Sequence, residues 1–73
     1  MTEVRALDEW QAFQAMRHFL LGFWERGGRP DVLTDILSWT EGKGPGRTAD
    51  PAMWLDWRRA VQSAIEGVPV EPR

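Results

Sequence analysis

Apolar residues recur at helical spacing in three segments of this 73-residue chain. The first segment, LDEWQAFQAMRHFLLGFWERGG, predicts a helix over residues 8–26, because its apolar positions fall within about 140° of arc on a helical wheel. Asp8 and Gln11 have the spacing of a capping box, and a pair of glycines ends the segment. The predicted core face of this helix consists of Ala12, Phe13, Met16, Phe19, Leu20, Phe23 and Trp24.

Two shorter segments show the same kind of pattern. RPDVLTDILSWTEGKG predicts a helix over residues 31–40, with Asp31 as a cap or first-turn acid. DPAMWLDWRRAVQSAIEG predicts a helix over residues 51–66, because Asp50 followed by Pro51 is preorganised for helix initiation. The predicted core faces are Val32, Leu33, Ile36, Leu37 and Trp39 in the former, and Met53, Trp54, Trp57, Ala60, Val61, Ala64 and Ile65 in the latter.

The segments between and after these helices carry no apolar periodicity. Residues 41–50, EGKGPGRTAD, are rich in glycine and predict a flexible loop, and residues 67–73 form a proline-broken tail. No segment alternates with the period of two that is typical of a strand. The sequence therefore predicts one helical domain over residues 1–73, an all-α fold in the form of a small three-helix bundle, whose core draws on five Trp and three Phe.

A few apolar residues lie at the margins of these faces or outside them, and exposed tryptophans are enriched at binding hot spots. Acidic residues on the predicted polar faces suit a basic partner. The candidate partner-binding residues are Trp10, Leu21, Asp31, Asp35, Trp39, Leu55 and Asp56.

Composition narrows the function classes. Eleven acidic against nine basic residues give a net charge of -2, which disfavours binding to a nucleic-acid backbone. The absence of cysteine excludes disulfides and thiolate metal sites. His18 is the one histidine and falls on the polar face of its helix, and GKGPGR lacks the Ser or Thr of a phosphate loop. We expect no catalytic residues, no metal and no cofactor, because so short a chain needs its volume for packing.

The remaining expectations concern location. No run approaches the roughly 18 consecutive apolar residues of a membrane span, and the start MTEVRALDEW is too polar and acidic for a signal peptide. We therefore expect a cytoplasmic protein that does not enter a membrane.

Residues 12–20, AFQAMRHFL, together with residues 50–57, DPAMWLDW, give the chain a resemblance to small helical bacterial proteins of the immunity type, which accompany contact-dependent or polymorphic toxins. The similarity covers the first and third predicted helices, about half of the chain. It implies a protein that binds and neutralises a cognate toxin domain and has no catalytic activity. It assigns no individual contact residues and does not identify the toxin's activity.

Two other classes stay open at this point. A helical nucleic-acid-binding regulator would use Arg58 and Arg59 on the third helix, although acids on the same helix favour a solvated mixed-charge surface. A self-associating structural protein would bury its exposed Leu and Trp residues in a homodimer.

Overall fold

The fold is known from a computed structural model, which describes residues 6–71. It contains three helices, α1 (Glu9–Arg26), α2 (Asp31–Trp39) and α3 (Pro51–Ile65). Two short strands, β1 (Gly42–Gly44) and β2 (Arg47–Thr48), lie between α2 and α3. The three helices predicted from the apolar pattern are therefore confirmed.

The helix starts follow the predicted capping chemistry. The backbone N–H of Gln11 donates to Asp8 Oδ1 at 2.7 Å, and the backbone N–H of Asp8 donates to Gln11 Oε1 at 3.0 Å. At α3, Asp50 Oδ1 accepts from the backbone N–H of Ala52 at 3.0 Å, directly before a proline in the first turn. Both caps satisfy N–H groups that a helix start leaves without an intrahelical partner.

The expectation that residues 41–50 contain no strand is wrong. β1 and β2 pair as an antiparallel hairpin, with Gly42 opposite Thr48. Thr48 is buried, and its Oγ1 donates to the backbone carbonyl of Asp50 at 2.6 Å. The strands have three residues and two residues, too few for an alternating pattern to be visible in the sequence. The protein is thus mostly helical with a small two-stranded sheet, and the purely all-α expectation is corrected.

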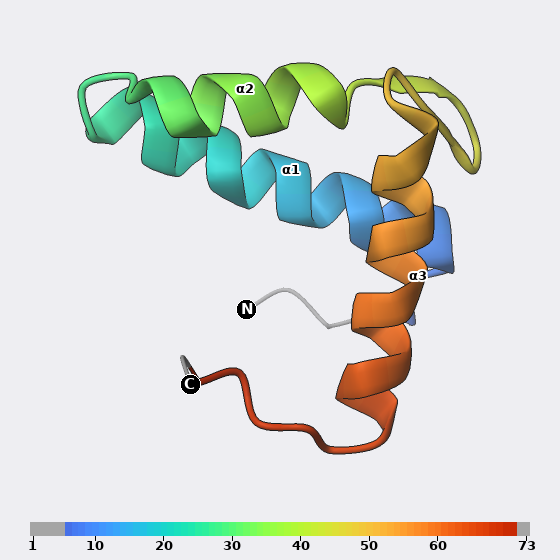
Figure 1. Cartoon of the computed structure of the whole chain (residues 1–73). Helices are drawn as coiled ribbons and strands as arrows, with labels where there is room; N and C mark the ends of the chain where they lie inside the picture. The colour runs from blue at the N-terminus through green and yellow to red at the C-terminus, as the bar shows by residue number, and fades with distance from the viewer. Residues whose placement is uncertain (1–5, 72–73) are drawn as a thin grey trace.

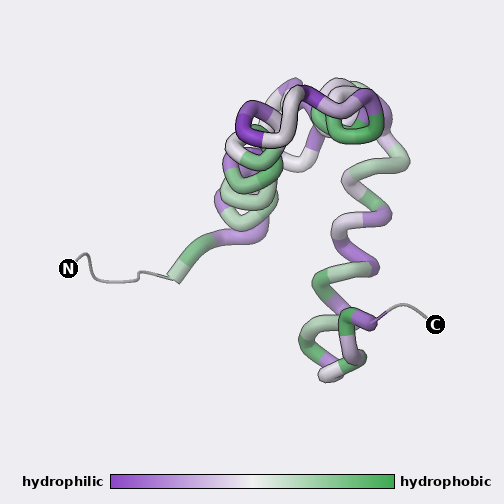
Figure 2. Tube along the Cα trace, turned by 90° about the vertical axis from the view of Figure 1, so that its left-hand side faces the viewer, coloured by the Kyte–Doolittle hydropathy of each residue, from purple (hydrophilic) through white to green (hydrophobic). Residues whose placement is uncertain are grey.

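The helices do not form a bundle. Figure 1 shows α1 and α2 lying side by side, whereas α3 runs steeply away from both. α1 packs along α2, and α3 packs against β2 of the hairpin. In the view of Figure 2, the C-terminal half of α3 projects away from the other two helices. The three-helix bundle predicted from the apolar faces is therefore replaced by an open arrangement.

Four rings join α1 to α3, and we call them the aromatic cluster: Trp10, Phe13, Trp54 and Trp57. Phe13 is 1% exposed and is the one fully buried hydrophobic residue within residues 6–71. Its ring lies 5.5 Å from that of Trp10 in a stacked arrangement, and 5.4 and 5.3 Å from those of Trp54 and Trp57 in edge-to-face arrangements. These are favourable geometries for aromatic pairs. The core is therefore small and lies where the first turns of α1 and α3 meet.

Much of the predicted core face lies in solvent. Phe19 is 65% exposed, Phe23 54%, Ile65 74% and Val32 70%, so their assignment to the core is wrong. The indole of Trp57, by contrast, is half-buried in the aromatic cluster. The predicted faces are buried near the start of α1 and α3 and exposed toward their ends.

The rotation of α1 accounts for the exposure of Phe19 and Phe23. Arg17, which interrupts the apolar face in sequence, points toward α2 and donates from Nη2 to the Leu37 carbonyl at 2.8 Å. Its Nε donates to Thr40 Oγ1 at 3.1 Å. A guanidinium at the C-terminus of α2 satisfies end carbonyls and complements the helix dipole. α1 therefore turns its Arg17 side toward α2 and leaves the flank that carries Phe19 and Phe23 uncovered.

Candidate protein-interaction surface

α2 presents apolar and acidic side chains away from α1. Its half-buried residues, Leu33, Ile36 and Leu37, lie on one side of the helix. Away from this side, exposed residues at i, i+1, i+4 and i+8 spacing fall within about 100° of arc on a helical wheel, which places them on a common face. We call this set the α2 outer face, and it consists of Asp31, Val32, Asp35 and Trp39.

Hydrogen bonds on the other side of α2 fix the direction in which this face points. Trp24 Nε1 donates to Thr34 Oγ1 at 2.7 Å, near the start of α2. Arg17 holds the end of the helix through the Leu37 carbonyl and the hydroxyl of Thr40. Thr40 is 5% exposed and its Oγ1 donates to the Ile36 carbonyl at 2.6 Å. α2 is therefore anchored to α1 at both ends, and its outer face is presented on a fixed element.

The α2 outer face combines apolar area with negative charge. Val32 is 70% exposed and Trp39 is 50% exposed. The carboxylates of Asp31 and Asp35 lie on the same face, and neither forms an ion pair with any residue between 6 and 71. The surface can thus offer an aromatic anchor and two acidic groups to one partner.

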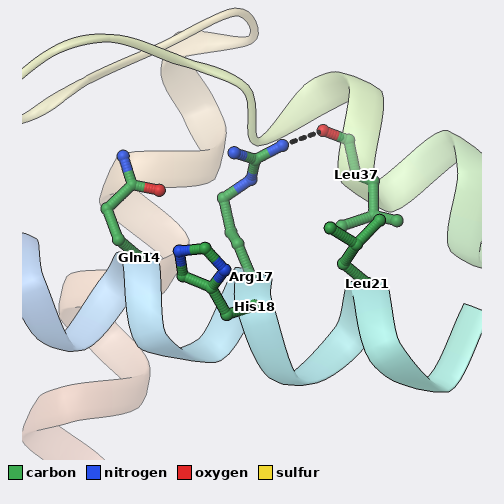
Figure 3. A pocket seen from close by; sticks show the side chains of 5 residues that line it. All are labelled: Gln14, Arg17, His18, Leu21 and Leu37. Carbon is green, nitrogen blue, oxygen red and sulfur yellow. Dashed lines mark hydrogen bonds between the residues drawn. The ribbon is translucent and has the colours of Figure 1, made fainter.

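Leu21 lies elsewhere, in a groove between α1 and α2. It is 39% exposed and lines a hollow of about 130 Å³ together with Leu37 and Arg17 (Figure 3). A neighbouring hollow of about 280 Å³ shares these three residues and continues past Trp24. Leu21 is exposed as its position on the wheel predicted, but the body of α2 separates it from the α2 outer face.

Leu55 and Asp56 lie on α3. Leu55 is 57% exposed and borders a hollow of about 390 Å³ beside the hairpin, next to Trp54. The carboxylate of Asp56 pairs with Arg59 Nη1 at 3.6 Å. These two candidates are exposed, but they belong to a different part of the molecule.

Trp10 is held in the aromatic cluster. Its ring also packs on the hairpin, since a Cβ added to Gly42 would lie 2.9 Å from Trp10 Cζ2. The residue is half-buried and links α1, the hairpin and α3. The structure therefore brings together Asp31, Asp35 and Trp39, adds Val32, and places Trp10 among the packing residues. Val32 was not among the candidates, but its i+3 and i+7 spacing to Asp35 and Trp39 could have placed it on their face.

In residues 6–71, no three His, Cys, Asp or Glu side chains gather where a metal ion could bind. His18 lies at the rim of the hollow in Figure 3, beside Gln14 and Arg17. None of the helices described is both long and apolar enough to cross a bilayer.

Known proteins offer no guide to the role of these surfaces. No family model, curated protein or solved structure matches the chain. Function is therefore inferred from the exposed surfaces themselves.

Proposed function

We propose that the chain is a non-catalytic protein-binding module whose docking surface is the α2 outer face. The observation that carries the proposal is the exposure of Trp39 and Val32 beside two carboxylates that have no cationic partner among the described residues. A large indole left half in water on an anchored helix is a feature of binding surfaces.

The position of the indole suits an anchor. Trp39 ends α2, and its backbone carbonyl accepts from the N–H of Asp50 at 3.0 Å, so the backbone at this point is fixed by the segment that leads into α3. A preorganised backbone lowers the ordering cost of association. Covering the exposed half of the ring and Val32 supplies apolar burial at the centre of the contact.

The carboxylates set the chemistry of the partner. Asp31 and Asp35 are one helical turn apart, so both can face one basic surface. Opposite charge speeds encounter and fixes orientation more than it raises affinity. The partner expected is a protein with Lys or Arg around an apolar pocket.

The immunity-type resemblance supplies a candidate partner. If residues 12–20 and 50–57 reflect that relationship, the basic protein is a toxin domain, and binding by the α2 outer face neutralises it. This role requires no catalytic group in the chain itself.

Binding measurements on matched variants test the proposal. A partner captured from the native host is identified by mass spectrometry, purified and titrated by calorimetry. Trp39→Ala is expected to weaken binding about 30-fold, the effect of a hot-spot residue worth about 2 kcal/mol. Leu55→Ala removes a residue of similar exposure on α3 and should leave the affinity unchanged. Equal affinities for wild type and a folded Trp39→Ala variant would refute the assignment.

A nucleic-acid-binding role is less well supported by the charges on α3. Arg58 Nε pairs with Glu9 Oε1 at 3.1 Å, and Arg59 Nη1 pairs with Asp56 Oδ1 at 3.6 Å. Both arginines already have acidic neighbours that a phosphate would have to displace.

A further inference from the structure

Two apolar stripes extend from the aromatic cluster into solvent. The α1 stripe comprises Met16, Phe19, Leu20 and Phe23, and the α3 stripe comprises Ala60, Val61, Ala64 and Ile65. Three of these side chains, Phe19, Phe23 and Ile65, are more than half exposed. Each stripe continues a helix face whose first turns are packed in the aromatic cluster. The amphipathic pattern therefore extends further along both helices than the core does.

The two stripes contain no charged residue and differ in the size of their side chains. On α1 the rings of Phe19 and Phe23 lie 6.1 Å apart and form an exposed aromatic pair. On α3 the stripe includes Ala60 and Ala64, whose small side chains allow close approach of a ring. No stripe residue is itself charged, although the guanidinium of Arg26 lies 5.7 Å from the centroid of the Phe23 ring and borders the α1 stripe.

We propose that a second copy of this chain covers the stripes, with the α3 stripe of each copy lying on the α1 stripe of the other. A two-fold axis makes both contacts identical, as in an isologous dimer. The arrangement reproduces between two chains the helix contact that a closed three-helix bundle would make within one. It uses a face other than the α2 outer face, so it does not depend on the proposed function.

The exposed area of the stripes sets the size of the contact that such a dimer could make. At roughly 200 Å² per phenylalanine, the exposed fractions of 65% and 54% give about 240 Å² from the two rings alone. Two-fold symmetry buries both stripes of both chains. The four rings then contribute about 480 Å², and Ile65, Ala60 and Ala64, which are also exposed, add to a contact that stays at or below the lower limit of the ~1,200–2,000 Å² range of stable interfaces.

The described residues of the C-terminal tail, up to residue 71, do not cover the stripes. Val70 is 96% exposed and Val68 is 46% exposed, although the tail turns back beyond α3 (Figure 1). The turn at Gly67, where φ is 76°, directs the chain away from the end of α3. Ile65, just before this turn, keeps 74% of its surface exposed.

Solution mass on matched variants tests the dimer. Sedimentation equilibrium of the wild-type chain over a range of concentrations up to about 100 μM should give twice the 8.4 kDa of one chain at the upper end. Phe23→Ser and Ile65→Ser, made singly, should each shift the association at least 10-fold toward the monomer. Circular dichroism checks that the helices persist, which is expected because both side chains are exposed in one copy.

Val32→Ser is the control, since it removes a residue of similar exposure from the α2 outer face and should leave the dimer intact. A wild-type mass of 8.4 kDa throughout would overturn the proposal. So would a dimer that Val32→Ser dissociates and that Phe23→Ser and Ile65→Ser leave unchanged. Neither result bears on heterologous binding by Trp39, which is measured separately.

Discussion

The N-terminal halves of α1 and α3, here called the near halves, meet in the aromatic cluster, and the C-terminal halves, the far halves, extend beyond it. Both halves carry the same apolar pattern but differ in burial. In the near halves, Phe13 is 1% exposed among three tryptophans. In the far halves, Phe23 and Ile65 are 54% and 74% exposed. Amphipathicity marks which side of a helix can be buried, but the crossing angle decides how much of that side finds a partner within the chain.

Truncation of the two phenylalanines should give the largest contrast. Phe13→Ala is expected to lower the free energy of unfolding by about 3–5 kcal/mol, because it empties the centre of the aromatic cluster. Phe23→Ala, measured by urea unfolding at concentrations where the chain is monomeric, should cost less than about 1 kcal/mol. Similar losses at both positions would show that the far halves are packed like the near ones.

The contact between the hairpin and α1 is the next test of the near half. A Cβ at Gly42 would lie 2.9 Å from both Gln14 Nε2 and Trp10 Cζ2. Gly42→Ala should therefore destabilise the fold by about 1–3 kcal/mol in urea unfolding, as overpacking does. Lys43→Ala, on the exposed next position, is the control and should be nearly neutral. A neutral Gly42→Ala would mean that the indole does not pack on the hairpin.

Arg17 fixes which side of α1 faces α2. Replacing Arg17 therefore tests why the far half of α1 is exposed. Arg17→Met keeps apolar bulk but removes the hydrogen bonds to Leu37 and Thr40, at a cost of about 1–2 kcal/mol. Amide hydrogen exchange in the last turn of α2 should accelerate. Arg59→Met, on an exposed pair, should change neither quantity. Unchanged exchange in Arg17→Met would show that the guanidinium does not hold the last turn of α2 in place.

The smallest effect is expected inside the aromatic cluster. Trp57 Nε1 is buried and has no hydrogen-bond partner among the described residues. Trp57→Phe removes this donor while keeping a ring, so the loss of packing is partly offset and the net change should stay within about 1 kcal/mol. A loss of 3 kcal/mol or more in thermal or urea unfolding would show that the indole N–H is satisfied.

The sequence was informative where the structure depends on local chemistry. Asp8 with Gln11 and Asp50 with Pro51 defined the helix starts, because capping involves only neighbouring residues. The exposure of Leu21 and Leu55 followed from the helical wheels. That Asp31, Asp35 and Trp39 share one face was not predicted, because the wheel of residues 31–40 placed Trp39 on the core face.

The rest depends on contacts between distant residues. Arg17 was not among the candidate residues, and only the position of the α2 carbonyls shows why it points toward α2. The hairpin of residues 42–48 was too short to be seen as alternation. The steep crossing of α3, which leaves Ile65 exposed, has no signature in the apolar pattern of α3 itself.

The reactivity of one introduced thiol tests the open arrangement most directly. The natural chain has no cysteine, so Ala64→Cys, Leu55→Cys and Thr48→Cys each carry a single reporter. At nanomolar protein, Ala64→Cys should react with a soluble thiol reagent within about threefold of the rate of Leu55→Cys, because unhindered thiols of similar thiolate fraction react alike. Thr48→Cys, at a buried position, should react far more slowly. If Ala64→Cys reacts as slowly as Thr48→Cys, α3 is closed onto α1, and the open arrangement is contradicted.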